Sequence, residues 1–97
     1  MTKASSAMNT ERRYKHAPDV IYESIEGQAV ILDLKKGLYF ELDRIGTKIW
    51  EEIAQGAEVR RLEERLLADF DVSETTVRND LSKLISELEQ AGLVVAE

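Results

Sequence analysis

The alternation of hydrophobic and polar residues predicts three short strands in the first half of the chain. The runs are Val20–Ile25, Ala29–Leu34 and Leu38–Leu42, and they are rich in β-branched and aromatic residues, as half-buried strands usually are. Glu26-Gly27-Gln28 and Lys35-Lys36-Gly37 separate the runs and are typical of hairpin turns. We therefore predict an antiparallel meander with two open edges.

The last of these strands has two different faces and leads directly into a helix. Its apolar face consists of Leu38, Phe40 and Leu42, and its other face carries Tyr39 and Glu41, because successive side chains of a strand point in opposite directions. Since the helix follows at once, we expect the free edge of this strand to lie beside the helices. Such an edge presents unpaired N–H and C=O groups that an extended peptide can use.

From residue 43 onward the pattern has the period of amphipathic helices. Asp43 is the expected N-cap of a first helix, and the apolar residues of that helix are Ile45, Ile49, Trp50 and Ile53. A second helix is predicted over about Glu58–Phe70, and Ser73 is expected to cap a third. The predicted fold class is α+β, with a three-stranded antiparallel sheet followed by a three-helix, winged-helix-turn-helix-like bundle.

The third helix is predicted to be the longest. Its apolar stripe comprises Val77, Leu81, Leu84, Ile85 and Leu88. Gly92 is the expected C′ residue, and the residues after it are expected to fold back onto the body. Most of this stripe is expected to be core, with Ile85 and Arg78 on its flank.

The first 19 residues show neither the periodicity of a helix nor that of a strand. We predict a flexible N-terminal arm over residues 1–19, which are polar, and a single domain over residues 20–97. His16 is the only histidine. Because it lies in the predicted arm, we expect it to be solvent-exposed rather than catalytic.

The composition excludes several classes of function. The chain has 97 residues, a hydrophobic fraction of 43% and no cysteine, which fits one small domain and excludes disulfides and zinc–thiolate sites. There is no apolar run of membrane-spanning length and no secretory signal, so we expect a cytoplasmic protein. No nucleophile with a histidine, phosphate loop or metal-ligand set stands out. We therefore predict a protein that is not an enzyme and that needs no cofactor or metal.

The second and third helices raise the possibility of DNA binding. The stretch VSETTVRNDLSKL resembles the helix-turn-helix of DeoR-type repressors, with Arg78 and Asn79 where base-reading side chains would lie. The net charge of −6 and the acidic third helix disfavour contact with phosphates, and no wing strands are expected after it. A winged-helix DNA-binding regulator is therefore the alternative to a peptide-binding protein.

Two longer segments resemble the PqqD-like family of peptide-recognition domains. They read AVILDLKKGLYFELDRIGTKIWEEI and LEERLLADFDVSETTVRNDLSKLISELEQAGLV. The resemblance extends over about residues 20–94. It is carried by the Leu-Tyr-Phe hairpin, by the helix start Gly46-Thr47-Lys48-Ile49-Trp50, and by Asp80-Leu81 with the step from Leu84 to Leu88.

The resemblance implies a RiPP recognition element, a non-enzymatic domain that binds the leader segment of a ribosomally made precursor peptide. The leader would add as a fourth strand to the third strand of the sheet and pack against the third helix. The hairpin and helix start look most like the stand-alone leader-binding protein of lasso-peptide pathways. Its implied partners are a leader peptidase of cysteine-protease type and a macrolactam-forming cyclase; the radical enzyme of pyrroloquinoline quinone synthesis is the other possibility. Neither nucleic acid nor a membrane is implied as a partner.

The expected peptide-binding residues are Gly37, Leu38, Tyr39, Phe40, Glu41, Leu42, Asp43, Val77, Arg78, Leu81 and Ile85. The strand residues are expected to provide main-chain hydrogen bonds, and the helix residues the opposing wall. Arg78 is expected to pair with an acidic leader residue. Two or three buried anchors contribute about 1.5–3 kcal/mol each, and ordering the leader offsets part of this. The expected affinity is near micromolar, about −8 kcal/mol.

Overall fold

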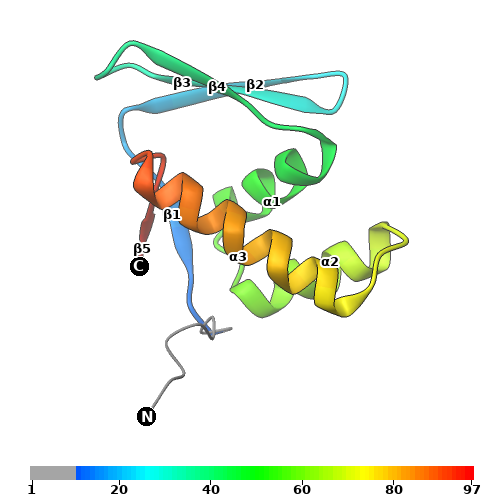
Figure 1. Cartoon of the computed structure of the whole chain (residues 1–97). Coiled ribbons are helices and arrows are strands. Elements are labelled where there is room, and N and C mark those ends of the chain that lie inside the picture. Colours follow the sequence, from blue (N-terminus) through cyan, green and yellow to red (C-terminus); the bar gives the residue numbers. More distant parts are fainter. Residues whose placement is uncertain (1–10) are drawn as a thin grey trace.

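The structure is a computed structural model that describes residues 11–97, and it has a small sheet lying above a layer of helices (Figure 1). The sheet consists of β2 (Val20–Ile25), β3 (Gln28–Asp33) and β4 (Leu38–Glu41). The helices are α1 (Arg44–Ala54), α2 (Val59–Asp69) and α3 (Glu74–Gln90). Two further strands, β1 (Tyr14–His16) and β5 (Val94–Ala96), form a separate two-stranded sheet. The predicted α+β class is confirmed.

The larger sheet is the predicted antiparallel meander, in the order β2-β3-β4. Ile25 pairs with Gln28, so only two residues connect β2 and β3. These are Glu26 and Gly27, with φ of 53° and 82°, the positive values that a type I′ turn requires. Gly27 adopts such a φ freely, whereas for Glu26 it costs about 1 kcal/mol.

The sheet packs one face onto the helices. Ala29 and Ile31 of β3 are completely buried on this inner face, and Phe40 lies opposite Ile31 and is half-buried. Tyr39 points to the outer face and is 67% exposed, as its alternation with Phe40 predicts. Leu38 belongs to the inner row but is 52% exposed, because it lies beside the hairpin turn, where the helices give less cover.

The predicted helix boundaries are close to the observed ones because the caps form as expected. The Asp43 carboxylate accepts a hydrogen bond from the Gly46 N–H at 2.8 Å, and the Ser73 hydroxyl accepts one from the Thr76 N–H at 3.2 Å. At the other end of α3, Gly92 has φ of 77°. The Leu93 N–H then donates to the Leu88 carbonyl oxygen at 2.9 Å, which closes a Schellman motif.

The core lies between the three helices and the inner face of the sheet. Trp50 is completely buried at its centre. The largest fully buried side chains around it include Ile31, Ile49, Ile53, Leu62 and Leu81. Most of the apolar residues predicted for α1 and α3 are therefore core, as expected, whereas Ile45 and Leu84 are only half-buried.

The N-terminal segment differs from the prediction. Residues 14–16, predicted as part of a flexible arm over 1–19, form strand β1, which pairs antiparallel with β5, so that Tyr14 lies opposite Ala96. Tyr14 is only 4% exposed. A three-residue strand gives no periodic signal in a polar stretch, which is why the sequence did not reveal it. Residues 1–10 of the predicted arm lie outside the described residues.

The expectation of a solvent-exposed His16 was wrong. Its ring stacks on Trp50 with a centroid distance of 3.6 Å, and Tyr22 meets it edge-on at 5.5 Å. His16 Nε2 lies 2.9 Å from the Trp50 carbonyl oxygen, so this nitrogen carries a proton and donates it. Burial lowers the pKa of His16 below its ordinary value of 6.5, and the hydrogen bond to Trp50 opposes this only in part.

The end of the chain also closes on the N-terminal segment. The Leu93 carbonyl oxygen accepts a hydrogen bond from the Ala17 N–H at 2.9 Å, and β5 uses its strand edge to pair with β1.

Among residues 11–97, no helix is long and apolar enough to cross a membrane.

Candidate functional site

The free edge of β4 is determined by its hydrogen bonds with β3. The Leu42 N–H donates to the Ala29 carbonyl oxygen at 2.9 Å, so Leu42 faces β3 with its main chain. In an antiparallel ladder such residues alternate with residues whose N–H and C=O point away. Tyr39 and Glu41 therefore present their main-chain groups to the open edge, and no strand of the described residues pairs with this edge of β4.

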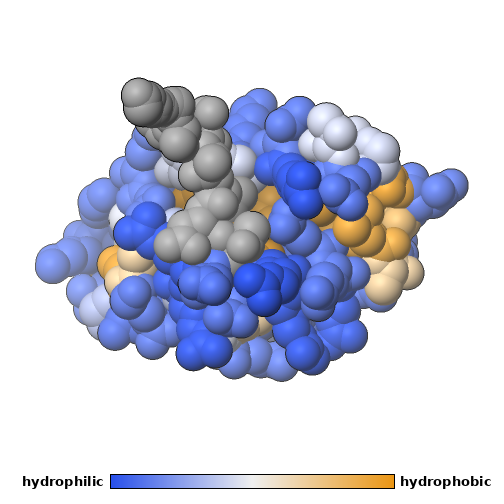
Figure 2. Space-filling model, turned by 90° about the horizontal axis from the view of Figure 1, so that it is seen from below, coloured by the Kyte–Doolittle hydropathy of each residue, from blue (hydrophilic) through white to orange (hydrophobic). Residues whose placement is uncertain are grey.

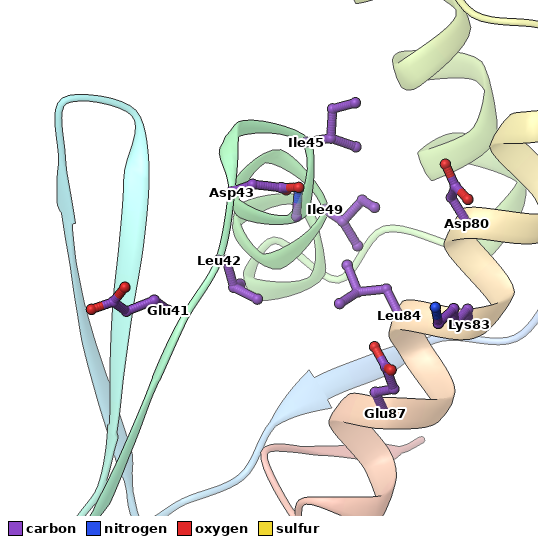
Figure 3. Close-up of a pocket in the computed structure, with 10 residues that line it drawn as sticks. Glu41, Leu42, Asp43, Ile45, Ile49, Asp80, Lys83, Leu84 and Glu87 are labelled. Atoms are coloured by element: carbon purple, nitrogen blue, oxygen red, sulfur yellow. The ribbon is translucent and has the colours of Figure 1, made fainter.

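A groove lies next to this edge, between the end of β4, the start of α1 and one side of α3 (Figure 3). Its volume is about 440 Å³. The residues that line it are Glu41, Leu42, Asp43, Ile45, Gly46, Ile49, Asp80, Lys83, Leu84 and Glu87. In Figure 3, Leu84 reaches from α3 toward Leu42 and Ile49, while Asp80 and Glu87 lie on either side of it. The groove thus combines an apolar floor with a charged rim.

The start of α1 holds β4 in this position. A Cβ on Gly46 would lie 3.2 Å from Asp43 Oδ1 and 3.4 Å from Leu42 Cβ, so only glycine leaves the capping carboxylate and Leu42 undisturbed. Thr47 is buried, and its hydroxyl accepts a hydrogen bond from the Ala29 N–H at 2.7 Å. The same hydroxyl lies 3.4 Å from the Leu42 carbonyl oxygen, to which it donates. The Gly-Thr pair therefore fixes the strand end against the helix.

The predicted strand residues divide into three groups. Glu41, Leu42 and Asp43 line the groove. Tyr39 lies at the open edge, on the outer face. The remaining predicted residues, Gly37, Leu38 and Phe40, lie at the hairpin turn or on the inner row and do not line the groove.

The residues predicted on α3 to contact the peptide do not line this groove. Val77, Leu81 and Ile85 are at most 3% exposed and belong to the core. Arg78 lies about 180° around the helix from Glu87, since each residue advances the helix by about 100°. The structure therefore does not bring these four residues to the groove.

The residues that do form this wall are Asp80, Lys83, Leu84 and Glu87. They recur at intervals of three and four residues, so they share one side of α3. On α1, Ile45 and Ile49 complete the floor. The sequence does contain this pattern, in which three charged residues lie on the same side of α3 as Leu84. Because only apolar positions were used to predict the contact surface of the helix, the charged residues beside Leu84 were not recognised.

The two flanks of α3 differ in their ion pairs. On the flank away from the groove, Arg78 Nε lies 3.1 Å from Glu63 Oε2, and Arg78 Nη2 lies 3.0 Å from Glu74 Oε1. On the groove side, the rim carries four carboxylates and the single ammonium group of Lys83. Within residues 11–97, no ion pair joins Glu41, Asp80 or Glu87 to a cation.

The face of the molecule shown in Figure 2 is mostly hydrophilic, with several hydrophobic areas, coloured orange, between the hydrophilic residues. This agrees with the composition, in which 33% of the residues are charged. A concave groove with an apolar floor and a few polar groups at its rim has the character of a binding site.

The sequence over residues 28–94 matches the family model described as coenzyme PQQ synthesis protein D (PqqD). The chain belongs to the PqqD family. The matched segment contains β3, β4 and all three helices, so the whole groove lies within the part of the chain that defines membership. No curated protein sequence matches the chain.

Two solved structures share this PqqD fold. "TbiB1 in Complex with the TbiA(beta) Leader Peptide" is 29% identical to the chain, and the alignment covers 82% of this chain and 93% of TbiB1, with a TM-score of 0.79. "Lasso peptide synthetase B1 complexed with the leader peptide" is 19% identical over 86% of this chain and 98% of its own length, also with a TM-score of 0.79. The second likeness concerns the fold alone. Each structure is a complex with a leader peptide.

The DNA-binding alternative receives no support from these findings. The two structural neighbours are complexes with peptides. Arg78, the candidate base-reading side chain, is engaged by two carboxylates. The strand after α3 pairs with β1 instead of forming a wing hairpin of the kind that contacts phosphates.

Proposed function

We propose that this PqqD-family protein binds the leader segment of a ribosomally synthesised precursor peptide by strand addition to β4. The observation that carries the proposal is the outward-facing main chain of Tyr39 and Glu41 directly beside the groove. The two leader-peptide complexes of similar fold support it.

The proposed binding mode assigns a separate task to each side of the leader. Its main chain pairs with Tyr39 and Glu41, which sets its register on β4. Because strand side chains alternate, every second leader residue then faces the groove. Apolar residues at these positions contact Leu42, Ile49 and Leu84, and the residues between them face the outer side of the sheet, near Tyr39.

The proposed binding residues therefore differ in part from those expected from the sequence. The groove residues Asp80, Lys83, Leu84 and Glu87 take the place of Val77, Arg78, Leu81 and Ile85 as the wall formed by α3. The buried residues among the latter support the wall from behind, because they fix α3 against the core.

The proposed protein acts by binding and presentation, without catalysis. Its partners would be the precursor leader and the enzymes that process it. The resemblance of the hairpin and of the helix start favours the lasso-peptide setting, with a leader peptidase of cysteine-protease type and a macrolactam cyclase. The radical enzyme of pyrroloquinoline quinone synthesis is the second candidate partner, since the family takes its name from that pathway.

A titration tests the proposal directly. The full chain is titrated with the labelled leader of the precursor encoded beside its gene, and in parallel with random duplex DNA. We expect saturable leader binding at about micromolar concentration and no binding to DNA. Salt-sensitive binding to DNA without binding to the leader would contradict the proposal.

The Tyr39→Pro variant tests strand addition itself. Proline removes the N–H that points to the open edge, and it is tolerated on edge strands when that N–H does not pair within the sheet. We expect a loss of leader affinity of at least about tenfold, with the circular dichroism spectrum unchanged. Tyr39→Ala is the matched control, because it removes the same side chain and keeps the N–H. A folded Tyr39→Pro variant that binds as tightly as Tyr39→Ala would exclude pairing at this position.

A further inference from the structure

The charges of the groove allow a more specific statement about the leader. We infer that the groove selects a leader segment in which a lysine or arginine lies two residues away from an apolar anchor. This inference rests on the proposed function, since it concerns the chemistry of the peptide at the same site.

The first observation is the balance of charge around the apolar floor. The carboxylates of Glu41, Asp43, Asp80 and Glu87 line the groove together with one cation, Lys83, which gives a net charge of −3. Asp43 is partly satisfied, because it caps α1 through the Gly46 N–H. Lys83 can neutralise only one of the others, so the rim stays negative.

The second observation is that some carboxylates of the helical layer have a cation of the chain as a partner, whereas those of the groove have none among the described residues. Arg78 pairs with Glu63 and Glu74, Arg65 pairs with Glu52, and Lys48 pairs with Asp69. The chain therefore supplies cations to several carboxylates outside the groove. Within the described residues it supplies none at pairing distance to Glu41, Asp80 or Glu87.

The third observation is the order of the residues along α3. Asp80 and Glu87 are two helical turns apart, about 10 Å, and Leu84 lies between them on the same side, facing Leu42 and Ile49 (Figure 3). Residues on one face of a bound strand are about 6.8 Å apart. A leader strand that runs along α3 with an apolar residue over Leu84 therefore places the neighbouring groove-facing residue near Asp80 or Glu87.

A basic side chain fits this second position better than any other. Lysine and arginine have long apolar stems that can lie along the floor while the charged end stays at the wet rim. There they meet a carboxylate without the desolvation that a buried charge would suffer. An acidic leader residue at the same position would face two or three like charges, so the rim also disfavours acidic segments.

Selection from a library of short random displayed peptides tests the inference, because it does not depend on the sequence of the leader. The full chain is immobilised at about 0.15 M salt, and the enriched peptides are sequenced. The same selection is made with the double variant Asp80→Asn/Glu87→Gln. The matched control is Glu64→Gln/Asp71→Asn, which removes two exposed carboxylates that lie outside the groove and are in no ion pair among the described residues.

We expect enriched peptides with apolar residues at alternate positions and with lysine or arginine at a neighbouring alternate position. The basic preference should disappear in the groove variant and persist in the control. One selected basic peptide should bind the groove variant roughly 3- to 10-fold more weakly, and its affinity should depend less on salt.

Two negative results can be told apart. Enriched peptides that compete for the Tyr39 edge but carry no basic preference would overturn this inference and leave the proposed function standing. If the Tyr39→Pro variant binds every enriched peptide as well as the parent chain does, or if no peptide is enriched, the proposed function itself is contradicted, and this inference with it.

Discussion

The buried side and the groove side of α3 belong to the same helix but differ in their burial and in their charge. On the buried side, Val77, Leu81 and Ile85 are at most 3% exposed, and each contacts the core. On the groove side, one half-buried leucine, Leu84, lies among three charged residues. The first side contributes free energy of folding, whereas the second leaves part of its apolar surface and most of its charge available to a ligand.

This difference explains why a single stripe of hydrophobic residues is an incomplete guide to a helix of this kind. The stripe identifies the side that stabilises the fold, because burial there must be complete. A binding side needs only enough apolar surface for a few anchors, and it needs polar residues to remain soluble when empty. The sequence pattern of a binding side is therefore a mixture of polar and apolar residues, and on α3 this side lies next to the buried one.

Of the variants that compare the two sides of α3, Leu81→Ala should have the largest effect on stability. Leu81 is completely buried, so its truncation leaves a cavity and should reduce the free energy of unfolding by about 2–5 kcal/mol. Urea denaturation followed by circular dichroism measures this loss. Leader affinity, measured at low temperature on the protein that remains folded, should change little, because Leu81 does not line the groove.

The Leu84→Ala variant makes the same chemical change three residues away, with the opposite outcome. Leu84 is half-buried and faces the groove, so we expect a stability loss of about 1 kcal/mol. The loss of an apolar partner for the leader should weaken binding by about tenfold, as measured by fluorescence anisotropy with a labelled leader. Equal effects of the two variants on affinity would mean that the groove is not where the leader binds.

The sequence predicted the fold far better than it predicted the wall of the groove. The strands, Asp43 and Ser73 caps and helices are local features, each encoded by a few neighbouring residues. Strand β1 depends on pairing with β5 at the other end of the chain, and three residues carry no local signal of such pairing. The wall formed by α3 depends on how that helix is rotated relative to β4, which only the packed core determines.

The Arg78→Ala variant tests whether the far flank of α3 takes part in binding. The sequence suggested that Arg78 would pair with the leader, but its guanidinium is paired with Glu63 and Glu74, and its side chain is 62% exposed. The pair with Glu74 is exposed, and such pairs contribute about 0–1 kcal/mol to stability. The Glu63 side chain is only 12% exposed, so its loss of a partner adds to this, and we expect a modest decrease in the midpoint of urea unfolding. Leader affinity should remain within about twofold; a loss comparable to that of Leu84→Ala would place the leader on this flank.

The smallest expected effect is a decrease in stability at low pH that leaves binding at the groove unchanged. Burial lowers the pKa of His16 in the folded protein below its ordinary value of 6.5. As the pH falls below about 6.5, the unfolded chain therefore takes up a proton that the folded protein resists. The contribution of neutral His16 to stability is fully present above pH 6.5 and is lost on acidification. Urea midpoints measured on either side of this value should show the decrease.

The His16→Phe variant provides the control, because a phenylalanine ring can stack on Trp50 but does not titrate. Its urea midpoint should fall less steeply than that of the parent chain as the pH decreases below 6.5, and identical slopes would show that His16 is not the group responsible. His16 is the only histidine and lies outside the groove, on the strand that joins the chain end after α3 to the core. Leader affinity of the folded protein should therefore stay constant across the same pH interval. A parallel decrease in affinity and stability would instead mean that the groove and the buried side of α3 do not act independently.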